Sequence, residues 1–166
     1  MGRLKLFGII LCLLLLIITI GALKPLSKSE SLEILDGVRE TLSDDPDVLT
    51  IFTNNVLISL IMFVPVIGLI IGTYAIYNTG LVFSSMGTTT EIPSGILLLT
   101  TSVLPFFWLE FVAYAASMTQ NIILTQNLLK FNIRNELKNL VSVVVLVVLL
   151  LLLGAFTEVF IINLVI

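Results

Sequence analysis

Leu104-Pro105-Phe106-Phe107-Trp108-Leu109-Glu110 places a proline, three aromatic residues and a carboxylic acid inside one apolar run. The run extends from Ile96 to Leu124 and contains no other charged residue. A proline within a membrane helix frees backbone groups that need new partners. An acid at that depth is costly unless it is neutralised or paired. The stretch therefore predicts a broken helix near Pro105, with Glu110 as a buried polar group beside the break.

The composition of the whole chain is that of a helical membrane protein. Of its 166 residues, 58% are hydrophobic and 11% are charged, whereas soluble domains carry about 25% charged residues. Four apolar stretches account for the difference, because roughly 20 apolar residues span a bilayer as a helix. We therefore expect an all-α, polytopic protein that contacts the lipid bilayer and forms a single transmembrane domain over residues 1–166.

The first apolar run, residues 6–23, follows Arg3 and Lys5. A basic start and an apolar centre are also typical of a signal peptide. The run is long for a signal, however, and Ile20-Gly21-Ala22-Leu23 is a poor cleavage site. We predict a retained helix whose N-terminus lies in the cytoplasm, because basic residues favour that side of the membrane. Cys12 lies within the run and is predicted to be a small packing residue.

Residues 24–50 form the only extended polar segment, predicted to be an acidic extracytoplasmic loop of a cell-membrane protein. Four aliphatic residues in it recur at helical spacing: Leu32, Leu35, Val38 and Leu42. This spacing predicts an amphipathic helix, with Ser29 or Ser31 as its N-cap and Asp47 as a cap of the next helix. Its acidic face is either a solvated surface or a docking surface for a partner. The candidate docking residues are Glu33, Asp36, Glu40, Asp44 and Asp45.

The remaining residues, 51–166, are predicted to form the core bundle. The run Leu49–Tyr77 carries no charge, and Pro65 near its middle predicts a kink. Gly68 and Gly72 form a small-xxx-small pair, which allows close approach of another helix. Asn54 and Asn55, near the outer end of the span, can bond to backbone or to another helix, and packing is the expected use. Asn78-Thr79-Gly80 predicts a turn or break, and a polar link is expected over residues 84–95.

The number of crossings follows from the basic residues Lys130, Arg134 and Lys138. If Leu49–Tyr77 and Ile96–Leu124 each crossed once, this basic segment would lie outside, which the positive-inside rule disfavours. An extra crossing between residues 78 and 104 would restore the expected orientation. We therefore predict about five membrane segments, including a half-helix before Pro105. Two alternatives remain: four spans, and a single long helix kinked at Pro105.

The candidate functional groups in the membrane are Glu110 and Glu158, the two acids embedded in apolar sequence. Neither membrane block contains a lysine or arginine, so Glu110 is expected to donate a hydrogen bond to carbonyl groups near Pro105. Proton or ion handling is the alternative. Glu158, near the end of its span, is expected to reach interfacial water. Gln120 and Asn121 are predicted to mark the approach to the basic interface.

Several classes of function are disfavoured by what the sequence lacks. It has no histidine and one cysteine, so we expect no Cys/His metal site, no cofactor and no enzymatic activity in this chain. Lysine and arginine total 8 and form no basic stripe, so nucleic-acid binding is not expected.

Four short motifs from Ile51 onward are shared with one family of integral membrane proteins. Ile51-Phe52-Thr53-Asn54-Asn55 has a Phe-x-x-Asn pattern, and Tyr77-Asn78-Thr79-Gly80 has an Asn-Gly pattern. Pro105 and Glu110 match the ends of a Pro-His-Gly-x-x-Glu motif, whose His and Gly are replaced by phenylalanines here. With Glu158 closing the last span, the chain resembles the stage II sporulation protein M family.

The resemblance implies a five-span protein without catalytic function. In spore formers, the family's member joins an assembly that recruits a cell-wall hydrolase during engulfment; that role is not carried over to this sequence. The predicted function is that of a scaffold or accessory subunit bound to other membrane protein subunits. The alternative is a small transporter or channel, assembled as a homo-oligomer, that uses Glu110 for proton or ion handling.

Overall fold

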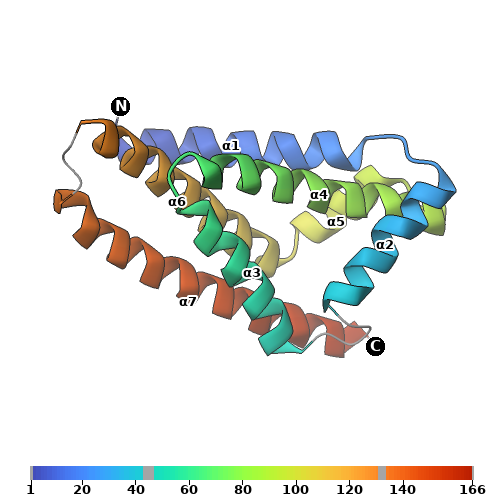
Figure 1. The fold of residues 1–166 in the computed structure, drawn as a ribbon. Helices are drawn as coiled ribbons and strands as arrows, with labels where there is room; N and C mark the ends of the chain where they lie inside the picture. Colours follow the sequence, from blue (N-terminus) through green and yellow to red (C-terminus); the bar gives the residue numbers. More distant parts are fainter. Residues whose placement is uncertain (1, 43–46, 131–133, 166) are drawn as a thin grey trace.

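The computed structural model describes residues 2–42, 47–130 and 134–165. Within these ranges the chain is all-helical, with seven helices and no strand (Figure 1), which confirms the predicted fold class. The helices are α1 (Arg3–Ala22), α2 (Lys28–Leu42), α3 (Val48–Met62), α4 (Ile67–Thr90), α5 (Ser94–Ser102), α6 (Pro105–Leu129) and α7 (Arg134–Val165).

Helix α6 is the centre of the bundle. It packs against α1, α3, α4, α5 and α7, and Figure 1 shows it between α1 and α7. Phe107, Phe111 and Met118 are among its buried apolar side chains. Gln120 and Asn121 are only 2% and 0% exposed. Neighbouring helices cover this part of α6 on several sides, and the place of these two residues at the approach to the basic interface stays a prediction.

Helices α1 and α4 run in the same direction. Gly21 of α1 lies against Gly80 of α4, and one turn further along, the Lys24 carbonyl accepts a hydrogen bond from Ser84. Small residues at such crossings let two backbones approach closely. This contact fixes α1 and α4 as one parallel pair.

Helices α6 and α7 run in opposite directions. Gln120 of α6 hydrogen-bonds Glu136 at the start of α7, whereas Glu110 lies beside Gly154 near the other end of α7. Arg3, at the start of α1, pairs with the same Glu136. The starts of α1 and α7 therefore share one end of the bundle with the end of α6, and we call it the basic end. It carries the following lysines and arginine: Arg3, Lys5, Lys130 and Lys138.

The chain reverses at Pro65 instead of kinking there. Helix α3 ends at Met62 and α4 begins at Ile67, and the two pack against each other as neighbours. Val66 has φ 65 and ψ −59, and Ile67 N–H donates to the Pro65 carbonyl at 2.8 Å. These values describe a tight γ-turn. The run Leu49–Tyr77 was predicted to be one helix bent at Pro65. It is two helices, because the γ-turn reverses the chain there.

Asn78-Thr79-Gly80 lies inside α4, so the predicted turn at this position is wrong. The predicted polar link over residues 84–95 is also helical as far as Thr90. A helix satisfies its own backbone groups, which outweighs local turn preference in an apolar setting. Gly80 serves packing instead: a methyl group there would collide with the Ile18 carbonyl and with Gly21.

The first helix and the polar segment follow the predictions in outline. The run 6–23 forms α1, beginning at Arg3, but Cys12 is exposed on its outer face and not a packing residue. The polar segment contains α2, which packs against α4 beyond the end of α1. Asp47 caps α3 as predicted, accepting from Thr50 N–H at 2.7 Å. These hydrogen bonds from Thr50 lower the pKa of Asp47.

The N-cap of α2 is Ser27, whereas Ser29 or Ser31 was expected. Ser27 N–H donates to Glu30 Oε2 at 2.8 Å, and Glu30 N–H donates to Ser27 Oγ at 3.3 Å. This reciprocal pair is a capping box, and hydrogen bonds from Ser27 lower the pKa of Glu30. Leu32 is 46% exposed, so the inward face of α2 is shifted from the predicted one.

Three helices, α1, α4 and α7, are long and apolar enough to cross a membrane. The bent pair α5–α6 brings the number to four if it counts as one span. Helix α3 is apolar but has only 15 residues. About five membrane segments were predicted, and this number is not confirmed.

Candidate functional site

The predicted break lies at Val103 and Leu104, between α5 and α6. The two helices meet at 87°. Pro105 is in the first turn of α6, where its missing N–H would have had no partner within the helix. Leu104 is extended, the conformation favoured before proline. The predicted half-helix, break and fuller helix are confirmed, in place of one long helix kinked at Pro105.

Trp108 satisfies a carbonyl group freed at this break. Its indole Nε1 donates to the Ser102 carbonyl at 2.8 Å. Phe107 lies edge-on to Trp108 and stacks on Phe111, with ring centroids 5.6 and 4.4 Å apart. The aromatic residues of this stretch therefore hold the corner together, a role that was predicted for Glu110.

Glu110 instead joins α6 to α3. Asn55 Nδ2 donates to Glu110 Oε1 at 2.6 Å, the hydrogen bond that the structure gives this carboxyl group. Asn54 Nδ2 in turn lies 3.4 Å from Asn55 Oδ1. Asn54 thus contacts the site through Asn55, and Asn55 is the residue that touches Glu110.

Two further polar contacts continue between the same helices. Ser59 and Ser117 hydroxyl groups lie 2.8 Å apart in a fully buried position. Asn121 Nδ2 donates to the carbonyls of Met62 and Val64 beside the reversal at Pro65, and the Val64 carbonyl also accepts from Gly68 N–H at 2.8 Å. The contacts advance along α3 and α6 together, so these two helices are parallel. We call these five side chains the polar seam: Asn55, Ser59, Glu110, Ser117 and Asn121.

Glu158 lies beside the polar seam. It follows Gly154 by one turn of α7, and Gly154 packs against Glu110. The carboxyl groups of Glu110 and Glu158 are close enough to interact electrostatically with each other. Both also interact electrostatically with the buried hydroxyl group of Tyr114. Glu158 itself is partly buried. The structure thus brings together Glu110, Glu158 and Asn54, three of the residues singled out from the sequence.

Other predicted residues lie away from the polar seam. Asn78 and Gly80 are on α4, where Gly80 contacts α1. Glu33, Asp36 and Glu40 are exposed on α2. Asp44 and Asp45 lie outside the described residues. The exposed acids of α2 define the other end of the bundle, which we call the acidic end.

The polar seam was only partly visible in the sequence. Asn55 and Ser59 are four residues apart, and Ser117 and Asn121 are also four apart, so each pair shares one helix face. Polar residues at this spacing inside apolar runs were a usable signal. Their pairing was hidden because it depends on where the chain reverses.

A second polar cluster closes the basic end. The Arg3 guanidinium contacts both carboxylate oxygens of Glu136, at 2.6 and 2.7 Å. Gln120 and Asn139 also donate to Glu136, at 3.4 and 3.5 Å. This cluster links α1, α6 and α7, and sequence reasoning used Arg3 and Gln120 only as markers of topology.

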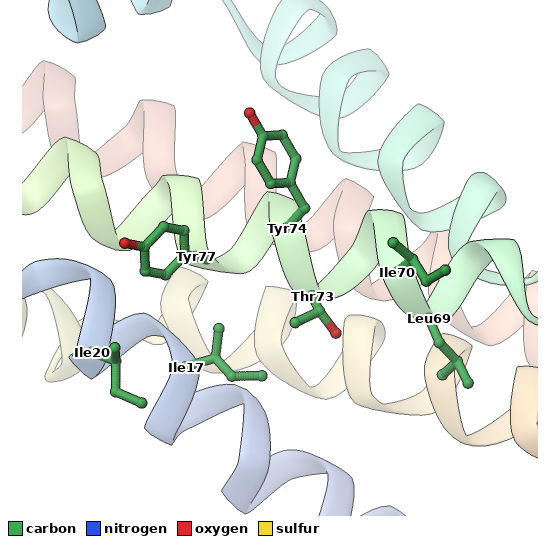
Figure 2. A pocket seen from close by; sticks show the side chains of 7 residues that line it. All are labelled: Ile17, Ile20, Leu69, Ile70, Thr73, Tyr74 and Tyr77. Atoms are coloured by element: carbon green, nitrogen blue, oxygen red, sulfur yellow. The ribbon is translucent and has the colours of Figure 1, made fainter.

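Two hollows stand out on the surface of the described part of the bundle. One, of about 630 Å³, is an apolar groove between α1 and α4 (Figure 2). The other, of about 370 Å³, lies between α2 and α3 and is lined by Asn54 and three threonines. Within the described ranges, no group of three or more His, Cys, Asp or Glu side chains could hold a metal ion.

Comparison with known proteins gives one match. The family model described as SpoIIM, Stage II sporulation protein M, matches residues 6–162. Neither curated proteins nor solved structures gave a match. The matched range covers all seven helices except the two ends, including the break at Pro105 and the polar seam.

Proposed function

Because the chain belongs to the stage II sporulation protein M family of membrane proteins, we propose that it is a non-enzymatic scaffold or accessory subunit of a larger membrane complex. Its bundle anchors it in the bilayer, and α2 is the surface that binds another subunit. The complete lack of histidine and the single, exposed Cys12 favour a role without catalysis.

The observation that carries the proposal is the way α2 is fixed to the rest of the bundle. The capping box fixes its start, and its inward face packs against α4. Ser31 is fully buried and donates to the Ser27 carbonyl at 2.9 Å. The outward face presents three acids and Leu32 at the end of the bundle. A rigid helix with an apolar residue among charges suits a partner with a basic rim.

The polar seam supports a structural role for the bundle. Ser59 with Ser117, and Asn121 with two carbonyls, satisfy one another within the bundle. Buried polar groups that are fully paired specify one packing of the helices. The seam thus holds α3 and α6 in a fixed register, as a scaffold requires.

The proposed orientation places the basic end in the cytoplasm and α2 outside. Arg3, Lys5, Lys130 and Lys138 meet at one end, which is the arrangement that the positive-inside rule favours. Five crossings result if α3 is a short one and α5–α6 is one broken crossing. Because α1, α4 and α7 run the same way, α7 would then end outside the cytoplasm.

The proposal is tested by purifying the tagged protein from native membranes in mild detergent. We expect a stoichiometric partner, and the variant Glu33→Lys/Asp36→Lys/Glu40→Lys should lower its yield about tenfold or more, since like charges across an interface cost several kcal/mol. Glu91→Lys, an exposed acid at the same end but outside α2, is the control and should retain the partner. Recovery of a homo-oligomer alone would contradict the proposal.

A transporter function is the second candidate, and one observation favours it. A hydrogen-bonded chain leads from the hollow between α2 and α3 through Asn54 and Asn55 to Glu110. Glu158 lies at its inner end. Proton or ion flux in proteoliposomes that disappears in Glu110→Gln would favour this candidate over a scaffold. Wild-type vesicles without flux would exclude it.

A further inference from the structure

Helices α6 and α7 bring two acidic side chains together from opposite sides of their contact. A Cβ added at Gly154 of α7 would lie 3.5 Å from Glu110 Cγ, so Glu110 extends onto the face of α7 that carries Gly154. Glu158 follows Gly154 by four residues and shares that face. Because helical side chains lean toward the N-terminal turn of their own helix, the Glu158 carboxyl group is directed back toward Glu110. The electrostatic interaction between the two acids agrees with this placement.

Tyr114 is directed at the same place from α6. It follows Glu110 by four residues, so it lies on the same helix face and leans back toward that acid. Tyr114 is only 6% exposed, and its hydroxyl group interacts electrostatically with both carboxyl groups. Within the described part of the chain, this hydroxyl group has no hydrogen-bond partner. Buried polar groups are normally paired, so the Tyr114 hydroxyl indicates a site that takes a further occupant.

The oxygen atoms of the two acids are largely open to such an occupant. Asn55 Nδ2 donates to Glu110 Oε1. Among the residues that the structure describes, none donates a hydrogen bond to Glu110 Oε2 or to the Glu158 carboxyl group. We call Glu110, Tyr114 and Glu158 the carboxyl site.

No basic side chain in the described ranges lies close enough to balance the carboxyl site. Helices α3, α4 and α5 carry no lysine, arginine, aspartate or glutamate, and Asp47, which caps α3, adds only a further negative charge. On α7, Lys138 precedes Glu158 by 20 residues, which is roughly 30 Å of helix. The other charged side chains that the structure describes on α1 and α7 lie at the basic end with Lys138: Arg3, Lys5 and Glu136.

The remaining titratable groups of the surrounding helices face elsewhere. Cys12 is exposed on α1, and Tyr74 and Tyr77 of α4 line the groove shown in Figure 2. The positive charge that the carboxyl site needs therefore comes from outside these helices. A metal ion is disfavoured, because the described residues offer no group of three or more acidic, histidine or cysteine ligands. A proton needs only one oxygen from each carboxyl group.

Two ionised carboxyl groups side by side in an apolar setting repel each other strongly. One proton held between them replaces this repulsion with a charge-assisted hydrogen bond. We propose that Glu110 and Glu158 share one proton across the contact between α6 and α7, and that the Tyr114 hydroxyl donates to the negative charge that remains. The shared proton ties α6 to α7, as Asn55 ties α6 to α3. The site is the same in a scaffold and in a transporter, and it requires no flux.

The test is labelling of the detergent-purified, full-length protein with dicyclohexylcarbodiimide, an apolar reagent that modifies protonated carboxyl groups. Peptide mass spectrometry identifies the labelled residue. At neutral pH we expect one label per chain, on Glu110 or on Glu158. Glu33, an exposed acid of α2, is the internal control and should stay unlabelled because it is ionised in water.

Glutamine variants test whether the proton is shared. In Glu158→Gln the side-chain amide donates to Glu110 in place of the proton, and Glu110→Gln does the same for Glu158. Labelling of the remaining acid should fall about tenfold in each variant, because coupled carboxyl groups affect each other's protonation by about this factor or more. Tyr114→Phe removes the donor to the charged form of the pair and should increase labelling at alkaline pH. Tyr74→Phe, an exposed tyrosine of α4, is the matched control.

Three results would overturn the proposal. Undiminished labelling in both glutamine variants would show that burial alone holds a proton on one acid. Two labels per chain would show that each carboxyl group has its own proton. Protection of the wild type by sodium chloride, but not by choline chloride, would show that a metal cation occupies the site.

Infrared spectroscopy tests the pair without any variant. The wild type at neutral pH should show the carbonyl band of a protonated carboxyl group, and the band should disappear at alkaline pH. Its absence at neutral pH would also contradict the proposal. Unfolding temperatures of all variants are measured in parallel, so that loss of labelling is separated from loss of fold. These measurements use neither a partner nor an ion gradient, so their outcome is independent of the proposed function.

Discussion

Asn121 donates hydrogen bonds to carbonyl groups at the reversal near Pro65, as Trp108 does at the break before Pro105. A chain that turns back at membrane depth exposes carbonyl groups, and each one needs a donor. Val66, a β-branched residue with positive φ, adds local strain to this turn. The two hydrogen bonds from Asn121 to Met62 and Val64 offset that cost from a neighbouring helix.

Replacing this amide tests its role directly. Asn121→Leu should lower the free energy of unfolding by about 1–3 kcal/mol, because the buried Met62 carbonyl loses its donor and the Val64 carbonyl keeps only its bond from Gly68 N–H. Asn127→Leu on the same helix is the matched control, since Asn127 bonds only the Ile123 carbonyl of its own helix. Denaturant titration in detergent micelles measures both. Equal stability of the two variants would show that the Asn121 contacts are dispensable.

At the scale of elements, the glycines of α4 decide how tightly the helices pack. Gly68 and Gly72 were predicted to allow close approach, and both lie against α3 and α6. Gly80 was expected to break the helix, yet it allows close approach of α1 to α4. The residues Asn78-Thr79-Gly80 have the same local preference for a turn in water and in lipid. Only the cost of unpaired backbone groups in an apolar setting distinguishes a break from a continuous helix there.

The contact between α1 and α4 makes Gly21 sensitive to one added methyl group. A Cβ at Gly21 would lie 2.5 Å from the Tyr77 carbonyl oxygen and 3.0 Å from Gly80 Cα. Gly21→Ala should therefore destabilise the protein by about 1–3 kcal/mol, the usual cost of overpacking.

Gly8→Ala provides the control within the same helix. A Cβ at Gly8 meets nothing within 4 Å, so this change should stabilise α1 by about 0.5–1 kcal/mol through helix propensity. Thermal unfolding of both variants in detergent gives the comparison. A stable Gly21→Ala protein would mean that α1 and α4 can separate without loss of fold.

At the scale of the whole molecule, the reversal at Pro65 brings the basic segments to one end. The sequence argument required one more change of direction between the acidic loop and the basic segment. It placed that change between residues 78 and 104, where glycines and prolines are dense. The structure places it at Pro65, within a run that composition alone shows as continuous. Charge balance could therefore predict that a reversal exists, but its position depends on which helix supplies a donor such as Asn121.

The orientation of the bundle can be measured with single cysteines in a Cys12→Ser background. Lys28→Cys and Glu91→Cys at the acidic end should react with an impermeant maleimide added to intact cells. Lys5→Cys and Lys138→Cys at the basic end should react only after permeabilisation, because positive residues are retained in the cytoplasm. The matched pairs control for local reactivity at each end. The proposed orientation would be contradicted if, within either pair, one cysteine reacted in intact cells and the other only after permeabilisation.

The short length of α3 has a consequence for the surrounding bilayer. Its 15 residues reach about 22 Å at 1.5 Å per residue, whereas the neighbouring α7, with 32 residues, exceeds the ~30 Å hydrocarbon core. Under the proposed orientation, hydrophobic mismatch thins the lipid beside α3 and tilts α7, at a cost of fractions of a kcal/mol per Å. The annulus of lipid is then uneven around the protein. Membrane thickness itself becomes a factor that selects where the protein resides and which face it turns toward its neighbours.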